Sequence, residues 1–317
     1  MINLLTLALI VSSAAIPTES LHAKSRQGLP GKVSSAPNKT QVSETVYIAD
    51  RGAQRIVKVD NISGGGWVTL TASMLGLGSF PVSSVATDKQ GRIYFCSNGV
   101  LHRVNSITGA GHVQMSLPAN AGTSSQVYVR SNGWVYVTLG NSQVVAYDTV
   151  GSNAVLKWQR SLSGSPTPPL DMYVDTAGTV TLAAETVITG TGNGQYPGII
   201  IEIKPTGNPL FYFPIVDLRG VSRDAKGRIF FACTYGIGRI DNINGAGYTM
   251  TPTTSPAVGC VVGDSKVYTT LPSVGKVGYL SLLPAASQVW FGTIGSGVKQ
   301  FTSTVDVAVF GFNFNAL

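Results

Sequence analysis

The chain has 317 residues, of which 44% are hydrophobic and 12% are charged, and its 22 basic and 15 acidic residues give a net charge of +7. The hydrophobic fraction excludes a wholly disordered chain, and no internal apolar run approaches the length of a membrane-spanning helix. The 37 glycines and the few charged residues favour a turn-rich all-β protein, because helix surfaces are usually filled with Glu, Lys, Ala and Leu.

The chain begins with an apolar run of signal-peptide length at residues 4–16. Small residues that suit cleavage lie at 13–15 and at Ala23, although no basic residue precedes the run. We expect residues 1–23 to be a signal peptide, and a buried strand or helix is the alternative. A signal peptide implies a secreted, periplasmic or cell-surface protein. Because no internal apolar run is long enough, we expect no transmembrane segment in the mature chain.

Residues 24–43 are rich in Gly, Pro, Ser and Asn, and they contain Lys24, Arg26, Lys32 and Lys39. This composition predicts a flexible basic leader. Such a leader either adheres to anionic surfaces or serves as a solvated linker.

The three cysteines, Cys96, Cys233 and Cys260, are odd in number and lack CxxC spacing. They therefore predict neither a disulfide framework nor a zinc site. Each lies in an apolar, strand-like context, where a buried free thiol is the usual state. Whether Cys233 and Cys260 form one bridge in an oxidising compartment stays open.

Two short modules recur along the chain. The first is a strand that ends in Asp or Asn and is followed by a Gly-x-Gly turn, as at residues 55–66, 100–111 and 236–247. The second is a polar turn with a glycine that leads into a β-branched or aromatic run. It occurs at residues 88–95, 131–137, 175–182 and 224–231, with a weaker copy at 263–268.

Six copies become visible when each is anchored on one residue of the second module. The anchors are Tyr47, Tyr94, Tyr136, Thr181, Phe230 and Tyr268, with spacings of 47, 42, 45, 49 and 38 residues. A period of this length with four short strands per copy is typical of β-propeller blades. In the second copy we expect strands at residues 84–87, 93–97, 100–104 and 112–117.

The first copy lacks an inner strand before Thr45, whereas the stretch 303–309 resembles an inner strand with no blade after it. We therefore expect the C-terminal stretch to supply the inner strand of the first blade, which closes the ring and leaves no open sheet edge there. The predicted fold is an all-β, six-bladed β-propeller of four-stranded blades over residues 44–317.

The module at residues 46–60 has a strand, Ala49-Asp50, a short turn, Arg55-Ile56 and a strand ending in Asp60. It resembles the NHL-type repeat, closely in the first, second and fifth copies and loosely in the others. This resemblance implies a six-bladed β-propeller. It implies no single function, because relatives include lyases, lactonases, secreted binding modules and assembly scaffolds.

The four strands of each blade are lettered a to d from the inner strand outwards. In enzymes with this fold, the reactive groups lie on the face formed by the b–c and d–a connections. Glu185 enters the longest b–c connection, at residues 186–198, and is a weak candidate for a catalytic or metal-binding role. Glu202 lies at a position that is basic and solvent-facing in other copies. His102 and His112 align with unrelated residue types in other copies, so we expect structural roles for both.

The b–c positions together predict a polar ring with a few aromatic residues, which suits protein or carbohydrate binding. The candidate binding residues are Asp50, Arg51, Asn98, Asn141, Asn193, Tyr196 and Tyr235. No metal-ligand set or cofactor motif is evident. A basic isoelectric point alone does not predict specific nucleic-acid binding.

These observations favour an exported binding or assembly module over an enzyme. The first alternative is an enzyme of the lactonase or lyase type that uses carboxylate and Asn groups at the channel mouth. The second is a self-associating surface or filament subunit, which the low charge and the mean hydropathy of +0.21 suit.

Overall fold

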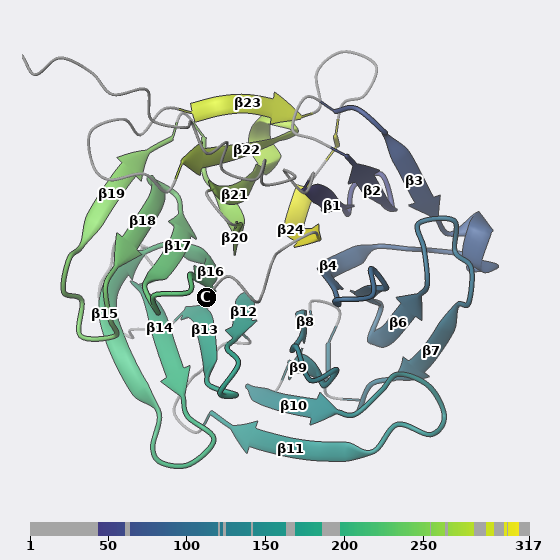
Figure 1. Cartoon of the computed structure of the whole chain (residues 1–317), viewed down its shortest axis with the longest axis horizontal. Coiled ribbons are helices and arrows are strands. Elements are labelled where there is room, and N and C mark those ends of the chain that lie inside the picture. Colours follow the sequence, from purple (N-terminus) through teal and green to yellow (C-terminus); the bar gives the residue numbers. More distant parts are fainter. Residues whose placement is uncertain are drawn as a thin grey trace, which may run out of the picture. The chain divides into compact units, whose positions relative to one another are not determined.

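The computed structural model shows a ring of six four-stranded antiparallel sheets (Figure 1). The residues that it describes are 44–60, 64–119, 121–122, 125–140, 142–162, 169–185, 197–253, 255–263, 266–281, 290–294, 301–302 and 304–310. The expected signal peptide and leader lie outside them. No helix in the described part is long and apolar enough to cross a membrane.

Each blade runs outward from the ring axis through strands a, b, c and d (Figure 1). The first three blades are β24 (Thr304–Phe310), β1 (Thr45–Asp50), β2 (Arg55–Val59) and β3 (Val68–Thr71); β4 (Val82–Thr87), β5 (Ile93–Ser97), β6 (Val100–Val104) and β7 (Val113–Ser116); and β8 (Val127–Val129), β9 (Val135–Leu139), β10 (Gln143–Tyr147) and β11 (Leu156–Ser161). The strands expected in the second copy are thereby confirmed to within two residues.

The other three blades follow the same order. They are β12 (Asp171–Val174), β13 (Val180–Glu185), β14 (Pro197–Ile203) and β15 (Leu210–Val216); β16 (Leu218–Arg223), β17 (Ile229–Cys233), β18 (Gly236–Ile240) and β19 (Thr249–Pro252); and β20 (Val258–Val262), β21 (Lys266–Leu271), β22 (Lys276–Ser281) and β23 (Trp290–Ile294). Two short 3₁₀ helices, η1 (Ser73–Leu75) and η2 (Pro272–Val274), lie in connections.

The chain closes the ring as the sequence predicts. Strand β24 pairs antiparallel with β1, from Thr45 opposite Phe310 to Asp50 opposite Thr304. The inner strand of the first blade thus comes from the far end of the chain. Because the first blade needs both segments, the fold is complete only when they meet.

The core is divided among the seams between blades. Each of six hydrophobic clusters combines residues of two neighbouring blades, such as Leu70 of the first blade with Phe95 of the second. This division follows from the strand pattern, since both faces of every sheet pack on a neighbour. The cysteines Cys96, Cys233 and Cys260 lie in these seams as buried free thiols, as expected.

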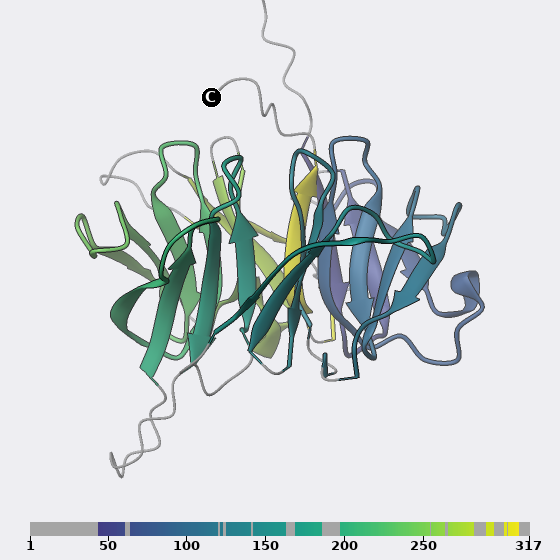
Figure 2. The same ribbon diagram turned by 90° about the horizontal axis from the view of Figure 1, so that it is seen from below.

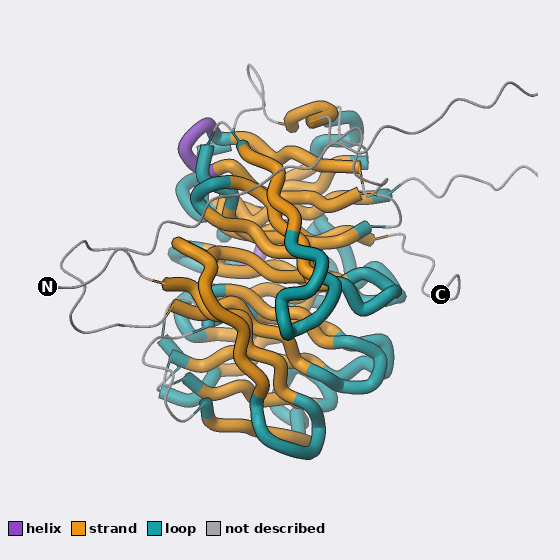
Figure 3. The backbone as a smooth tube through the Cα atoms, turned by 90° about the vertical axis from the view of Figure 1, so that its left-hand side faces the viewer, coloured by secondary structure: helices purple, strands orange, loops and turns teal. Residues whose placement is uncertain are grey.

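The two faces of the ring differ in their connections (Figures 2 and 3). We call the face formed by the a–b and c–d turns the a–b face, and the opposite one, formed by the b–c and d–a connections, the b–c face. Strands run from one face to the other, so a residue's place along its strand fixes the face to which it is nearer.

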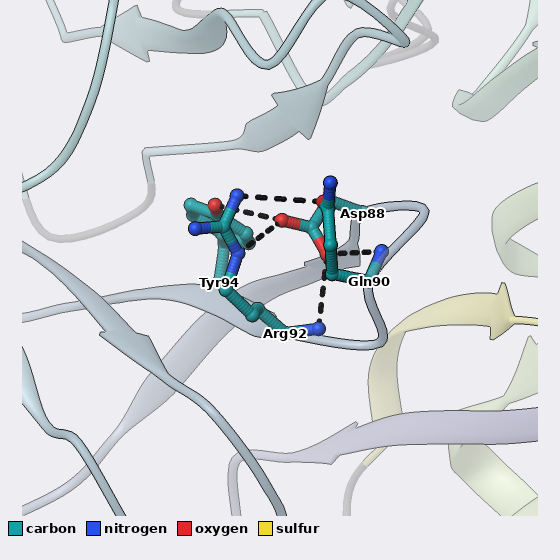
Figure 4. A network of polar contacts seen from close by, with 4 residues as sticks. All are labelled: Asp88, Gln90, Arg92 and Tyr94. Carbon is teal, nitrogen blue, oxygen red and sulfur yellow. Dashed lines mark hydrogen bonds and ion pairs between the residues drawn. The ribbon is translucent and has the colours of Figure 1, made fainter.

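A carboxylate holds the a–b turn of the second blade together (Figure 4). Asp88 accepts hydrogen bonds from the backbone N–H groups of Gln90 and Arg92, both at 3.0 Å, from the Arg92 guanidinium at 2.5 Å and from the Tyr94 hydroxyl at 3.0 Å. Gly91 in this turn has a φ of 77°. The recurring Asp-x-x-Gly-Arg pattern is therefore a turn motif whose charges are used within the turn.

The same motif holds the fifth blade's a–b turn. Asp224 accepts hydrogen bonds from the backbone N–H groups of Lys226 and Arg228 and from the Arg228 guanidinium. The Arg228 side chain then lies over the Phe230 ring, 5.7 Å from its centroid. In both turns an acidic and a basic residue therefore bind each other, and neither charge is available to a partner.

In the first and fifth blades, one pair of cross-strand partners in strands b and c compensates in size. The first blade pairs Ile48 with Val57, whereas the fifth pairs Phe231 with Gly238. A Cβ atom at Gly238 would lie 2.0 Å from the Phe231 ring, so the missing side chain makes room for that ring.

We predict that Gly238→Val destabilises the protein by about 1–3 kcal/mol, the usual range for overpacking a core. Adding Phe231→Ile recreates the Ile–Val pair of the first blade and should restore most of the loss. Denaturant unfolding of both variants checks this. If the double variant is no more stable than Gly238→Val, size matching does not explain the glycine.

Candidate functional site

A cavity of about 700 Å³ lies along the ring axis, inside the six a strands. Its walls are largely apolar, with Val85, Val129, Val174 and Val309 among the lining residues. Two carboxyl groups, Asp171 and Asp306, also line it, and it reaches the a–b turns of the third, fourth and fifth blades. The cavity is therefore an apolar tube with acidic side chains in its wall and charged turns at the a–b face.

Asp306 links the first blade to the second. Its Oδ2 accepts hydrogen bonds from the backbone N–H of Val85 and the hydroxyl of Ser84, both at 2.9 Å, and its Oδ1 accepts one from the backbone N–H of Val307 at 2.8 Å. Burial raises the pKa of this carboxyl to about 6, although the three donors favour its charged form.

Asp171 makes the corresponding link between the fourth and fifth blades. It accepts hydrogen bonds from the backbone N–H groups of Met172 at 2.7 Å and Val221 at 2.8 Å, and one from the backbone of Cys260 in the sixth blade. Burial, and next the charge of Asp306, hold the pKa of Asp171 well above its ordinary value.

The two carboxyl groups come from blades that are three positions apart in a ring of six, so they approach from opposite sides. Because each disfavours ionisation of the other, the pair holds a proton at a pH where isolated carboxyls are charged. Hydroxyl groups continue the same type of link, since Ser84 accepts from Val127 N–H at 3.0 Å and Ser222 from Val262 N–H at 3.1 Å.

Tyrosines line the cavity on the side of the third and fourth blades. Tyr128 and Tyr173 meet edge to face, with ring centroids 5.2 Å apart, and their side chains are hydrogen-bonded to each other. Burial raises the pKa of both hydroxyls. The corresponding residues in the other blades are small: Ala86, Ser222, Val261 and Ala308. The cavity is thus lined by two aromatic side chains on one side and by smaller side chains at the corresponding positions of the other blades.

Charged residues gather where the cavity reaches the a–b face. Arg130 donates to the carbonyl of Thr176 and thereby joins the third blade to the fourth. Arg223 forms an ion pair with Glu202, and Lys226 is exposed in its turn. Glu202 was expected to face solvent, and that expectation is wrong: its side chain is 9% exposed because Arg223 of the next blade covers it.

The predicted binding residues do not form one site in the described part. Asp50 is fully buried, bound to the Arg55 guanidinium and to the backbone N–H of Thr302, while Arg51 is half-buried in the turn that follows. Asn98 and Tyr235 are exposed in the b–c turns of the second and fifth blades, on opposite sides of the ring. Their role stays a prediction.

The remaining candidates fall outside the described residues, namely Asn141, Asn193, Tyr196 and the side chain of Glu185. Within the described part, no group of three His, Cys, Asp or Glu side chains is arranged to hold a metal ion.

The two histidines of the described part contact each other away from the cavity. His102 Nδ1 lies 3.0 Å from His112 Nε2, and the His102 ring stacks on Phe95. Burial, and next the proximity of His112, lower the pKa of His102 to about 4. This pair fills a seam position that holds other residue types in other blades, as its alignment predicts.

Asp171 and Asp306 are the residues that the sequence reasoning missed. Both occupy the position that Ser84 holds in the second blade, and each accepts a hydrogen bond from a backbone N–H of the following blade. The signal was present, since each is an isolated acidic residue in an otherwise apolar inner strand. Acidic residues are almost never fully buried unless they have partners.

Solved structures with the same fold are only distantly similar in sequence. The structure of a nidogen/laminin complex matches with a TM-score of 0.62 and 10% identity, over 84% of this chain and 98% of that chain. A streptogramin B lyase matches with a TM-score of 0.57 and 15% identity, over 83% of each chain. Regucalcin from Agrobacterium tumefaciens, a calcium-binding protein, matches with a TM-score of 0.52 and 13% identity, over 72% of this chain and 77% of that chain.

These structures are six-bladed β-propellers, and at such low identities the similarity shows the fold alone. No protein-family model matches the chain, and no curated protein matches it in sequence. The neighbours include a protein in a complex, an enzyme and a calcium-binding protein, so they select no function.

We predict that Asp306 makes stability fall as pH rises through about 6. The folded state raises the pKa of this carboxyl from 3.8, so its contribution is complete below pH 3.8 and is lost above about 6. His102 acts in the opposite sense, because its lowered pKa costs stability as pH falls from 6.5 towards 4.

The measurement is therefore the difference between the wild type and Asp306→Asn in free energy of unfolding, followed from pH 4 to pH 8 in about unit steps. The advantage of the wild type should shrink as pH rises. If the difference is constant, or grows with pH, Asp306 does not hold a proton in the folded state.

Proposed function

We propose that the chain is an exported propeller of NHL-like repeats that acts by binding, with the axial cavity as its ligand site. The cavity carries this proposal, since its volume of about 700 Å³ lies within the range of about 300–1,000 Å³ that is typical of ligand pockets. Its aromatic side and its charged end supply the few placed polar groups that such pockets use.

The chemistry of the deep carboxyls also favours binding. Each oxygen of Asp171 and Asp306 accepts at least one backbone hydrogen bond, and the bonds from Val221 and Val85 join neighbouring blades. A group that must keep two blades together is costly to move during a reaction. A nidogen appears with laminin in one structural neighbour, which supports complex formation as a use of this fold.

One observation favours an enzyme of the lactonase or lyase type as a second candidate. Two opposed carboxyls whose pKa values are both raised resemble acid–base pairs in enzymes. That candidate requires the wild type to turn over a lactone at a rate that depends on a group with a pKa near 6. The Asp306→Asn variant should lose this activity.

We predict that a cavity ligand raises the melting temperature of the wild type and leaves that of Thr176→Trp unchanged. Thr176 lines the cavity and is exposed, so a tryptophan there should fill its opening without disturbing the core. The matched control is Ala177→Trp, since Ala177 is the next exposed residue of the same turn and does not line the cavity.

The probes are neutral sugars, acidic sugars and short peptides, each tested by thermal unfolding. A ligand at about a hundred times its Kd should shift the melting temperature by about 5 °C or more. The proposal is contradicted if no class shifts the wild type, or if Thr176→Trp responds as fully as Ala177→Trp. Turnover of a probe would favour the second candidate.

A further inference from the structure

The a–b turn of the fourth blade departs from the motif that holds the turns of the second and fifth blades together. In those two blades an arginine lies four residues after the turn aspartate and binds one oxygen of Asp88 or Asp224, as Figure 4 shows for the second blade. The corresponding residue of the fourth blade is Thr179, which has no guanidinium. The fourth-blade carboxylate, Asp175, therefore lacks the ion pair that its counterparts form.

In the described part of the chain, one carboxylate oxygen of Asp175 has no hydrogen-bond donor. Its Oδ1 accepts a hydrogen bond from the backbone N–H of Thr179 at 2.8 Å, and neither a hydrogen bond nor an ion pair from these residues reaches its Oδ2. Asp175 is half-buried and lines the axial cavity. Its second oxygen can therefore accept a hydrogen bond from a ligand in that cavity.

The aromatic residue of the fourth blade also lies one strand nearer the axis than in its counterparts. The second and fifth blades pair a small residue of strand a with an aromatic residue of strand b. The fourth blade has the reverse order, because Tyr173 in β12 pairs with Thr181 in β13. Tyr173 lines the cavity, where it meets Tyr128 of the third blade. Burial, and next the charge of Asp175, raise the pKa of Tyr173, which shows that the carboxylate lies near this ring.

Cationic donors accompany the carboxylate. Arg130 holds the position of the turn aspartate in the third blade, and its guanidinium donates to the carbonyl of Thr176. Lys226 is exposed in the fifth-blade turn, and no carboxylate of the described residues pairs with it. Both residues line the cavity. The a–b end of the cavity thus offers one acceptor, Asp175, and two cationic donors beside an aromatic side.

This arrangement suits an uncharged ligand that is rich in hydroxyl groups. An anion would meet the charge of Asp175, and a cation would meet Arg130 and Lys226. The other charged residues at this end form ion pairs with each other or with Glu202. A hydroxyl group both donates and accepts, so a sugar satisfies the acceptor and the donors together, while the apolar faces of its ring contact the tyrosines and the cavity wall.

We propose that the axial cavity binds a neutral sugar at its a–b end, where Asp175 accepts hydrogen bonds from the sugar hydroxyls and Arg130 and Lys226 donate to them. This contact set rests on the proposed function, because it lies in the same cavity and names its ligand class. Its place in the repeat supports it, since proteins break their own structural pattern mainly at functional or strained sites.

The test restores the arginine that the repeat has in other blades. Thr179→Arg gives the fourth blade the aspartate–arginine spacing of the second and fifth blades, so the introduced guanidinium should bind the open oxygen of Asp175. The matched control is Arg92→Thr, the reverse change in a turn that does not line the cavity. Asp175→Asn is the second variant, which keeps an acceptor for the backbone N–H of Thr179 and removes the charge.

Binding is measured by titration calorimetry at neutral pH with neutral mono- and disaccharides of glucose, galactose, mannose and N-acetylglucosamine. Glucuronate and glucosamine serve as the anionic and cationic forms of one ring. We expect the wild type and Arg92→Thr to bind a neutral sugar, and Thr179→Arg and Asp175→Asn to bind it about tenfold more weakly.

A second readout separates a ligand contact from a merely structural role. The wild type should prefer glucose over glucuronate, and Asp175→Asn should narrow this preference because the repelling charge is gone. Thermal unfolding shows whether Thr179→Arg folds; if it does not, Asp175→Asn decides.

Three results overturn the proposal. If a sugar binds and Thr176→Trp blocks it, but Thr179→Arg and Asp175→Asn bind it as the wild type does, the cavity is the ligand site and the assigned contacts are wrong. If only acidic sugars or peptides bind, the ligand class is wrong and the cavity remains the site. If none of these probes binds, this proposal and the proposed function fail together.

Discussion

The pairing of β24 with β1 is the constraint on which the rest of the molecule depends. No blade contains a complete core, because each hydrophobic cluster is shared by two neighbouring blades. The ring therefore has stable seams only when the first blade receives its inner strand from the far end of the chain. The same strand carries Asp306, so closure also places one of the two deep carboxyl groups.

Two buried carboxyl groups line the cavity along the ring axis and set its polarity. Asp306 and Asp171 are buried at a cost in solvation, and both use their oxygens to bind backbone N–H groups of the next blade. Apart from these two carboxyl groups the cavity walls are largely apolar, and the other charged residues lie at its a–b end. We regard it as a binding site whose deepest polar groups are structural.

The sequence predicts the fold well because the fold repeats. In the copies anchored at Tyr94 and Phe230, the recurring turns and the alternation of apolar and polar residues define strands b and c. Ring closure also follows from the sequence, because the strand-like stretch at residues 303–309 has no blade after it. It predicts the site poorly because the decisive contacts cross between blades. Neither the bond from Asp306 to Val85 nor the cover that Arg223 gives Glu202 can be read from local spacing. The sequence does place polar residues at one corresponding position of three inner strands, namely Asp306, Ser84 and Asp171. This pattern indicates links between blades only once the inner strands are known to lie side by side around the axis.

Native-state hydrogen exchange of the backbone amides of Val85 and Val221 tests the central claim most directly. Both amides donate to a deep carboxylate across a seam, at 2.9 and 2.8 Å. If these bonds hold the closed ring together, both amides exchange only through global unfolding, with the protection of the core strands. Exchange as fast as in the a–b turns would contradict the account, because the carboxyl groups would then not act as links between blades.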